Sequence, residues 1–330
     1  RSRGLGDVYK RQAHTFGVGI IDENGKILAD EREVYKPPKG SGIHPREAAE
    51  EHIKNSKIVL KNSLESCRLK IKEIDVIAFS QGPGLPNCLQ VGASLARYLS
   101  LKYKKPLIGV NHCIAHIEIG KLMTGCRDPV IVYCSGGNTQ IIAYVKGKYR
   151  IFGETEDIAI GNAFDVLARY LGLEMPGGPK IDELAKNGKW VELPYVVKGM
   201  DLSFTGILTE CRRKCEKSVK IEDICYSFVE TVFSMLTEVT ERALAHTDKK
   251  EVLLVGGVAA SQRLKEMMNI MCKEREAKCY VVPRKYSGDN GVMIAWNGIL
   301  AFNSGRITRI KDSTIRKDWR TDEVEISWIK

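Results

Sequence analysis

The amino-acid sequence predicts an α/β protein built from two domains or lobes. Its 330 residues are more than one simple hydrophobic core accommodates. Short apolar runs typical of buried strands alternate with amphipathic stretches typical of helices. Glycine, histidine and carboxylate residues follow the predicted strand ends, which is where ligands gather in α/β sheets.

Strand and helix patterns divide the chain near residue 128. The part before it has strands predicted at residues 13–21, 26–35, 74–80 and 106–110, and helices at 46–67, 87–101 and after Asn111. The part after it has strands predicted at 129–134, 139–145, 149–153, 252–257 and 278–282, and helices at 181–186, 221–246, 261–275 and 292–303. We expect one lobe of residues 13–128 with about 298–330, and another of residues 129–297.

The composition is that of a soluble protein with reduced thiols. Hydrophobic residues make up 43% and charged residues 28%. No stretch approaches the roughly 20 apolar residues that cross a bilayer, and no secretory signal is visible, so a cytoplasmic location without membrane association is expected. The ten cysteines are irregularly spaced. Cys211 and Cys215 lie one helical turn apart, but no second pair completes a zinc cage.

The formal charge of +10 favours a polyanionic partner. The first twelve residues, RSRGLGDVYKRQ, hold four basic groups and one acid, so +7 remains without them. A merely solvated basic surface fits this charge as well.

The strongest metal signal is the pair His112 and His116. Histidines at i and i+4 on a helix project from one face and can hold one ion together. A metalloprotease would place its glutamate base directly after the first histidine, where this chain has Cys113. Two surface or capping histidines are the alternative interpretation. Asp289, in the turn SGDNG, is either a cap or a metal-binding carboxylate.

Two glycine-rich turns could hold an anion. The turn Ser135-Gly136-Gly137-Asn138 joins two predicted strands, and its amides could cradle a phosphate or carboxylate. The segment VGGVAA at 255–260 joins a buried strand to a helix N-terminus. An ordinary hairpin and an ordinary strand–helix turn remain open for the two segments.

Seven motifs, in order, resemble the universal family of transfer RNA threonylcarbamoyladenosine transferases. They are NHCIAHIEIG (111–120), YCSGGNTQIIAY (133–144), IGNAFD (160–165), PGGPKIDELA (176–185), KGMDLSFTGIL (198–208), VGGVAASQRL (255–264) and SGDNGVMIAW (287–296). The resemblance runs from about Ala13 to Lys330. It is closest to the catalytic subunit of the archaeal and eukaryotic KEOPS complex, whose bacterial relative is TsaD.

The resemblance implies a two-lobed fold shared with actin, sugar kinases and heat-shock ATPases, each lobe built on a ribonuclease-H-like sheet around a nucleotide cleft. It implies transfer of a threonylcarbamoyl group from threonylcarbamoyl-AMP to the adenosine beside the tRNA anticodon. ATP is the other nucleotide that such a cleft could take. Expected partners are tRNA and KEOPS subunits, including a separate small kinase (an ATPase) and a small dimerising subunit.

The resemblance also implies site residues. The metal ligands are His112, His116, Tyr133 and Asp289, around one divalent ion per subunit, with iron(II) favoured over zinc(II). The residues matching substrate and nucleotide contacts are Tyr133, Cys134, Ser135, Gly136, Gly137, Asp165, Gly178, Asp182, Ser261 and Asp289. No side chain is assigned as a general base beyond the metal site.

The chain departs from the family pattern in two places. Ser261 stands where the family usually has asparagine, so nucleotide affinity is expected to differ. Residues 1–12 replace a hydrophobic first strand and its glycine- and threonine-rich turn, and we expect them to be foreign, and disordered or poorly paired. Two rival functions remain: a small-molecule kinase of the same fold, and a scaffold regulated by nucleotide.

Overall fold

The computed structural model describes residues 3–8, 15–35 and 44–329. It divides into two compact units, one of Arg1–Leu122 with Gly288–Lys330 and one of Met123–Ser287. The expected lobe boundary near residue 298 is therefore about ten residues too late. The helix α10 (Gly291–Asn303) belongs to the first unit because it packs along β1, β2 and β4 of that unit's sheet.

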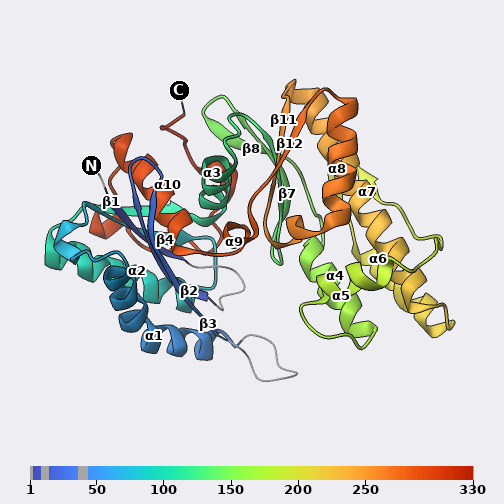
Figure 1. The fold of residues 1–330 in the computed structure, drawn as a ribbon, viewed down its shortest axis with the longest axis horizontal. Helices are drawn as coiled ribbons and strands as arrows, with labels where there is room; N and C mark the ends of the chain where they lie inside the picture. Colours follow the sequence, from blue (N-terminus) through green and yellow to red (C-terminus); the bar gives the residue numbers. More distant parts are fainter. Residues whose placement is uncertain (1–2, 9–14, 36–43, 330) are drawn as a thin grey trace. The chain divides into compact units, whose positions relative to one another are not determined.

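The first unit contains a five-stranded mixed sheet in the order β3-β2-β1-β4-β5 (Figure 1). Its strands are β1 Arg3–Val8, β2 Thr15–Asp22, β3 Ile27–Val34, β4 Val76–Gly82 and β5 Leu107–Asn111. Its other helices are α1 Pro45–Ser66, α2 Pro86–Tyr103 and α3 His112–Thr124. Pairing is antiparallel between β1, β2 and β3, and parallel between β1, β4 and β5.

Side chains along β2 point alternately to the two faces of this sheet, and helices cover both faces. Phe16, Val18 and Ile20 point to one face and join the core on the side of α1 and α2. Gly19 points to the other face, where a Cβ atom would lie 2.2 Å from the backbone nitrogen of Val292 in α10. Only glycine allows α10 to approach β2 so closely.

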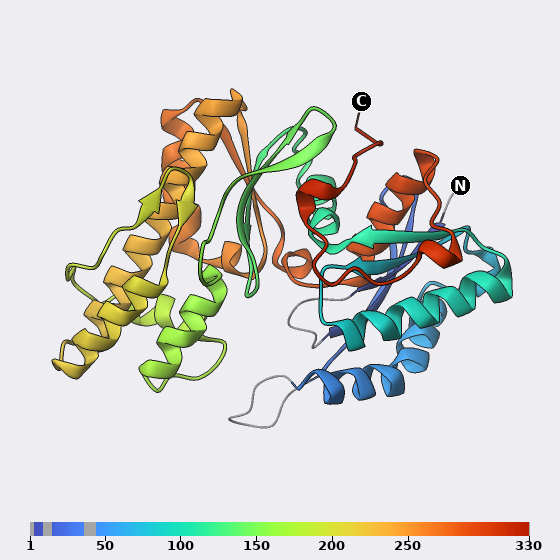
Figure 2. The same cartoon turned by 180° about the vertical axis from the view of Figure 1, so that it is seen from behind.

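The second unit has the same strand order around a separate core. Its strands are β6 Val130–Cys134, β7 Thr139–Val145, β8 Lys148–Glu154, β11 Glu251–Val255 and β12 Lys278–Val281. Its helices are α4 Ile160–Tyr170, α5 Gly177–Ala185, α6 Thr205–Glu216, α7 Ile221–Thr247, α8 Gln262–Glu274 and α9 Arg284–Ser287, beside the short pair β9 Val197–Lys198 and β10 Asp201–Leu202. The long helix α7 runs beside α5 and α8 (Figure 2) and contributes many of the buried apolar residues.

The sheet order of this unit is β12-β11-β6-β7-β8. Here β6, β7 and β8 pair antiparallel, and β6, β11 and β12 pair parallel, as in the first unit. Both units therefore place the first strand in the centre, between the second and the fourth. This repeated topology confirms the expected pair of ribonuclease-H-like sheets.

The expectation that residues 1–12 are disordered or poorly paired was wrong for Arg3–Val8. This segment forms β1, which pairs with β2 along its whole length and with β4 from Gly4 to Asp7. A central position offers backbone hydrogen bonds on both sides, and these outweigh the weak strand preference of glycine and aspartate. Residues 1–2 and 9–14 lie outside the described part of the chain.

The predicted elements from Thr15 onward are present, with boundaries shifted by a few residues. The helix predicted at 181–186 begins earlier, at Gly177, and α4 and α6 are helices of the middle region that the apolar pattern did not delimit. Among the described residues, no helix combines the length and the apolar character needed to cross a bilayer.

Candidate metal centre and nucleotide-binding residues

The helix α3 begins at His112, directly after the end of β5. The side chain of Asn111 caps it, because its Oδ1 accepts hydrogen bonds from the amides of Cys113 (3.0 Å) and Ile114 (3.2 Å). This cap fixes the first turn of α3, which carries His112 and, one turn later, His116 on the same face. Both histidines are buried, with 2% and 0% of their surface exposed.

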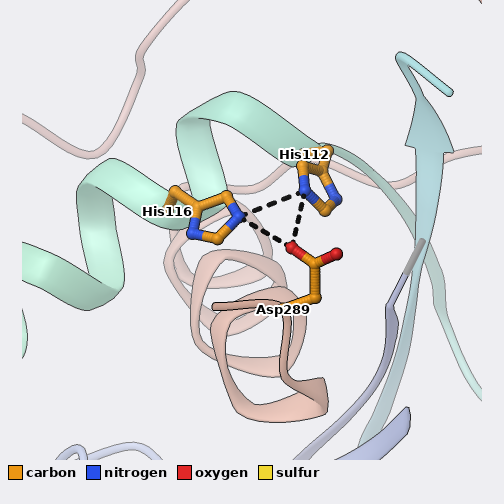
Figure 3. A group of neighbouring side chains, drawn as sticks. All are labelled: His112, His116 and Asp289. Atoms are coloured by element: carbon orange, nitrogen blue, oxygen red, sulfur yellow. Dashed lines mark hydrogen bonds and ion pairs between the residues drawn. The ribbon is translucent and has the colours of Figure 1, made fainter. Parts of the chain in front are cut away.

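Asp289 comes to the histidines from the loop before α10. Asn290 caps this helix, since its Oδ1 accepts a hydrogen bond from the amide of Met293 at 2.9 Å. Nη1 of Arg32, on β3, donates to the main-chain oxygen of Asp289 at 3.0 Å and holds the loop against the sheet. The carboxylate of Asp289 remains directed at α3, as Figure 3 shows.

The three side chains form one compact group of possible ligands. The Nε2 atoms of His112 and His116 lie 3.2 Å apart, and Oδ1 of Asp289 lies 3.4 Å from the first and 3.1 Å from the second. An ion bound at about 2.0–2.2 Å holds neighbouring ligand atoms roughly 3.0–3.5 Å apart. The three distances therefore fit a shared metal ion.

This geometry decides between the interpretations that the sequence left open. His112 and His116 are buried, so they are not surface histidines, and the cap of α3 is Asn111. The cap of α10 is Asn290, and the carboxylate of Asp289 belongs to the group of possible ligands instead. In the described residues no group of three or more potential ligands includes a cysteine, in line with the expected free thiols.

The second unit carries the two glycine-rich turns. Residues 135–138 form the predicted hairpin between β6 and β7, in which the amide of Ser135 donates to the oxygen of Asn138 at 2.8 Å. Oγ of Ser135 accepts the amides of Gly137 (3.4 Å) and Asn138 (3.1 Å). Two of the amides expected to cradle an anion therefore already have a partner inside the turn.

Close backbone packing brings two other segments to this hairpin. A Cβ atom on Gly161, in the first turn of α4, would lie 2.7 Å from the oxygen of Ser135. A Cβ atom on Gly256, after β11, would lie 2.2 Å from the oxygen of Cys134. Both positions require glycine, and Gly256 has a positive φ of 97°. The N-terminus of α4 thus lies against the hairpin, where its dipole favours negative charge.

Asp182 and Ser261 present buried oxygen atoms without partners. Neither Oδ1 of Asp182 nor Oγ of Ser261 makes a hydrogen bond of normal geometry. Burial raises the pKa of Asp182, and the nearby hydroxyl of Ser261 opposes this only in part. These atoms suit a ligand that supplies hydroxyl groups, such as a ribose.

Asp165, on α4, contacts the start of α5, where Gly178 lies. The Asp165 carboxylate accepts the amide of Gly177 at 2.9 Å, and burial raises its pKa. No atom lies within 4 Å of a Cβ built on Gly178, so the space above it is open. Gly178 and Asp182 are one helical turn apart on α5 and so share one face of it.

Tyr133 is the one expected metal ligand that does not belong to the group formed by His112, His116 and Asp289. It is the last residue but one of β6 in the second unit, directly before Cys134, and its ring is fully buried. The sequence interpretation missed Asn111, Asn290 and Arg32, which position the ligands. An asparagine directly before a helix is a capping signal, so the first two could have been found. Nothing in the sequence marks Arg32.

The family model for tRNA N6-adenosine threonylcarbamoyltransferase matches residues 26–296. A probable bifunctional tRNA threonylcarbamoyladenosine biosynthesis protein from Methanocaldococcus jannaschii is 55% identical over 96% of this chain and 59% of its own length. A tRNA N6-adenosine threonylcarbamoyltransferase from Thermococcus sibiricus is 55% identical over 96% of this chain and 97% of its own length.

Among solved structures, HypF from T. kodakarensis is similar in fold, with a TM-score of 0.64 and 16% identity, over 92% of this chain and 48% of that one. This likeness agrees with the expected actin-like and sugar-kinase-like fold. The family match and the two archaeal relatives cover most of the chain at high identity. The chain belongs to the TsaD family of tRNA N6-adenosine threonylcarbamoyltransferases.

Proposed function

We propose that this chain transfers the threonylcarbamoyl group from threonylcarbamoyl-AMP to the N6 amine of the adenosine beside the tRNA anticodon, and releases AMP. The observation that supports it most is the meeting of His112, His116 and Asp289 in a chain of this family. The acyl carbon–oxygen bond to the phosphate breaks, a carbon–nitrogen bond to the base forms, and the amine loses a proton.

The metal ligands belong to this proposal. Two histidines and one carboxylate with further open positions are the donor set typical of iron(II), which we therefore favour over zinc(II). Tyr133 would complete the protein ligands of the single ion. When bound, the ion would supply Lewis-acid polarisation and orient the substrate.

The second unit would hold the adenylate. The Asp182 carboxylate would accept hydrogen bonds from the ribose hydroxyls, and Ser261 would contact the same nucleoside. The open space above Gly178 would take the adenosine, with Asp165 fixing the start of α5. The residues of the hairpin, Tyr133 to Gly137, would face the phosphate or the threonyl end.

The partners follow from the same proposal. The bound nucleic acid is tRNA, and the other subunits are those of a KEOPS complex, including a small kinase and a small dimerising subunit. The relative named bifunctional is longer than this chain, which spans 59% of it. The cytoplasmic location expected from the sequence is also part of the proposal.

The test combines elemental analysis with a transfer assay. Purified protein is incubated with threonylcarbamoyl-AMP and tRNA, with the KEOPS partners added in a parallel reaction, and modified adenosine is measured. We expect adenylate-dependent modification that requires the bound metal. Turnover of ATP with a sugar, without modified adenosine, would instead support a small-molecule kinase. Complex formation without transfer under either condition would support a scaffold.

A further inference from the structure

A cavity lies in the first unit, and none of the three possible metal ligands is among its lining residues. Its volume is about 260 Å³, and its walls come from β5, from α10 and from the C-terminal segment 306–328, which is red in Figure 2. This is enough space for several water molecules or one small ligand. Neither the metal group nor the expected nucleotide residues line it.

Two buried donors in this wall have no acceptor. Asn297 on α10 and Trp319 in the C-terminal segment expose only 3% and 8% of their surface. The amide nitrogen Nδ2 of Asn297 and the indole Nε1 of Trp319 make no hydrogen bond. The indole nitrogen can only donate, so it requires an acceptor from the cavity. A buried donor left unsatisfied costs about 1–3 kcal/mol.

The charged groups of the wall are mainly cationic. Arg306, Arg309 and Arg316 line the cavity together with the carboxylate of Asp312, and Glu323, which is not part of the lining, pairs with Arg316. Asp312 is paired with Arg309 at 2.5 Å. Within the described residues, the guanidinium of Arg306 donates to the main-chain oxygen of Glu325 at 2.6 Å and pairs with no carboxylate.

The indole ring is held in place from two sides. The guanidinium of Arg316 lies 4.2 Å from the ring centroid of Trp319 and pairs with Glu323 at 3.2 Å. The main-chain oxygen of Trp319 accepts a hydrogen bond from Nδ2 of Asn111 at 3.1 Å. The donor of Trp319 is therefore pre-positioned, which lowers the entropic cost of binding.

We propose that this cavity binds a phosphate group, as inorganic phosphate or a small phosphate monoester. The donor of Asn297 comes from α10, and those of Trp319 and Arg306 come from two places in the C-terminal segment. A tetrahedral phosphate offers more acceptor oxygens to these donors than a planar monocarboxylate, which has two, and its negative charge complements the guanidinium of Arg306. The volume excludes a folded RNA and restricts the ligand to a small molecule.

The experiment is calorimetric titration of the full chain with inorganic phosphate at constant ionic strength, before and after removal of bound metal by a chelator. Arg306→Gln removes the exposed cation, and Trp319→Phe removes the indole N–H while keeping a ring beneath Arg316. We expect each variant to weaken phosphate binding roughly ten- to hundredfold. Lys311→Gln is the matched control, because Lys311 is exposed on the same segment but lies outside the cavity wall.

Equal affinity in wild type, Arg306→Gln and Lys311→Gln would overturn the proposal, since phosphate would then bind elsewhere, for example at the metal or in the second unit. Absence of binding at millimolar phosphate would show a cavity that holds water only. Titrations with acetate and with adenosine 5′-phosphate distinguish the ligand classes. An affinity for acetate equal to that for phosphate overturns the phosphate assignment. Tight binding of adenosine 5′-phosphate that is lost in Arg306→Gln identifies the ligand as a phosphate monoester. Arg306 is exposed, so its variant tests the site even if Trp319→Phe fails to fold.

Discussion

Nε2 of His116 lies 3.1 Å from Oδ1 of Asp289, although 173 residues separate the two in the chain. The contact depends on the packing of α10 against the sheet, where Gly19 and Gly291 let the two backbones meet. It also depends on the cap of α3, which places His116 one turn after His112. The three possible ligands thus come from two elements that only the folded sheet brings together.

Alanine at His112, His116 or Asp289 is expected to remove the metal from the purified protein and to abolish transfer. A site that has lost one ligand binds a divalent ion far more weakly, because each ligand contributes directly to affinity. Elemental analysis measures the metal content, and the assay with threonylcarbamoyl-AMP and tRNA measures activity. Circular dichroism checks that each variant is folded, which matters since all three side chains are buried.

His44 and His246 provide the controls for this prediction. His44 is exposed directly before α1, and the ring of His246 packs against Phe152 with centroids 5.6 Å apart. Their alanine variants should keep the metal. Full occupancy in both His112→Ala and His116→Ala would mean that the ligands are others. Transfer by metal-free protein would contradict a role for the ion in the reaction.

Nucleotide binding should weaken as the pH falls. The loss should begin at a higher pH than it would for a carboxylate with an ordinary pKa. Burial raises the pKa of Asp182, so this group takes up its proton earlier as the pH falls. Only the ionised form accepts hydrogen bonds from both ribose hydroxyls, and binding therefore favours loss of that proton. Adenosine affinity, measured by calorimetry between pH 7 and pH 5, should decrease in wild type; adenosine is used because the phosphate of AMP itself takes up a proton at about pH 6. The affinity should be weaker and nearly independent of pH in Asp182→Asn; parallel curves would refute the role of Asp182.

Ser261→Asn should strengthen adenylate binding. The hydroxyl of Ser261 is buried without a partner, and asparagine adds reach and an amide donor near Asp182. One additional hydrogen bond corresponds to about 0.5–1.5 kcal/mol, or roughly two- to twelvefold in affinity. Ser261→Ala should leave affinity unchanged or slightly lower. An asparagine variant that binds AMP more weakly than Ser261→Ala would show that the serine is adapted to this pocket.

The sequence predicted most strands and helices because their apolar patterns are local. The two histidines were also found from local spacing, since residues at i and i+4 on a helix share a face whatever surrounds them. Asp289 remained ambiguous because a turn carboxylate caps or coordinates according to its tertiary neighbours, and only the cap by Asn290 decides it. Arg32 could not be predicted, since its contact with the Asp289 loop joins β3 to a segment 257 residues away.

Asp157 should stabilise the second unit in a pH-dependent way. Partial burial acts to raise the pKa of its carboxyl, but hydrogen bonds from the Ser203 hydroxyl and from the amides of Phe204, Thr205 and Ile158 outweigh it and hold the pKa below the usual range. A depressed pKa stabilises the fold above the unfolded value, about 4, and this contribution is lost as the pH falls towards the folded value.

Asp157→Asn is therefore expected to lower the free energy of unfolding by about 1 kcal/mol at neutral pH, a small value because the group is largely exposed. Denaturant melts at pH 7 and at pH 3 measure the difference from wild type, which should shrink at the lower pH. Glu156→Gln is the matched control, since Glu156 makes an exposed ion pair with Lys198. A difference that grows on acidification would contradict the assignment.

The strand β1 should be necessary for the stability of the first unit. Its glycines should nevertheless make it less stabilising than an apolar strand in the same central position. Deleting residues 1–12 removes the strand between β2 and β4, so both would lose a backbone partner, and we expect an insoluble protein or a much lower melting temperature. Gly4 and Gly6 each cost about 0.5–1 kcal/mol relative to alanine inside a strand, through the entropy of the unfolded chain. Replacing residues 3–8 with an apolar strand should therefore raise the melting temperature above that of the wild type. A deletion that melts like the full chain would show that β1 contributes nothing to stability, as the sequence alone had suggested.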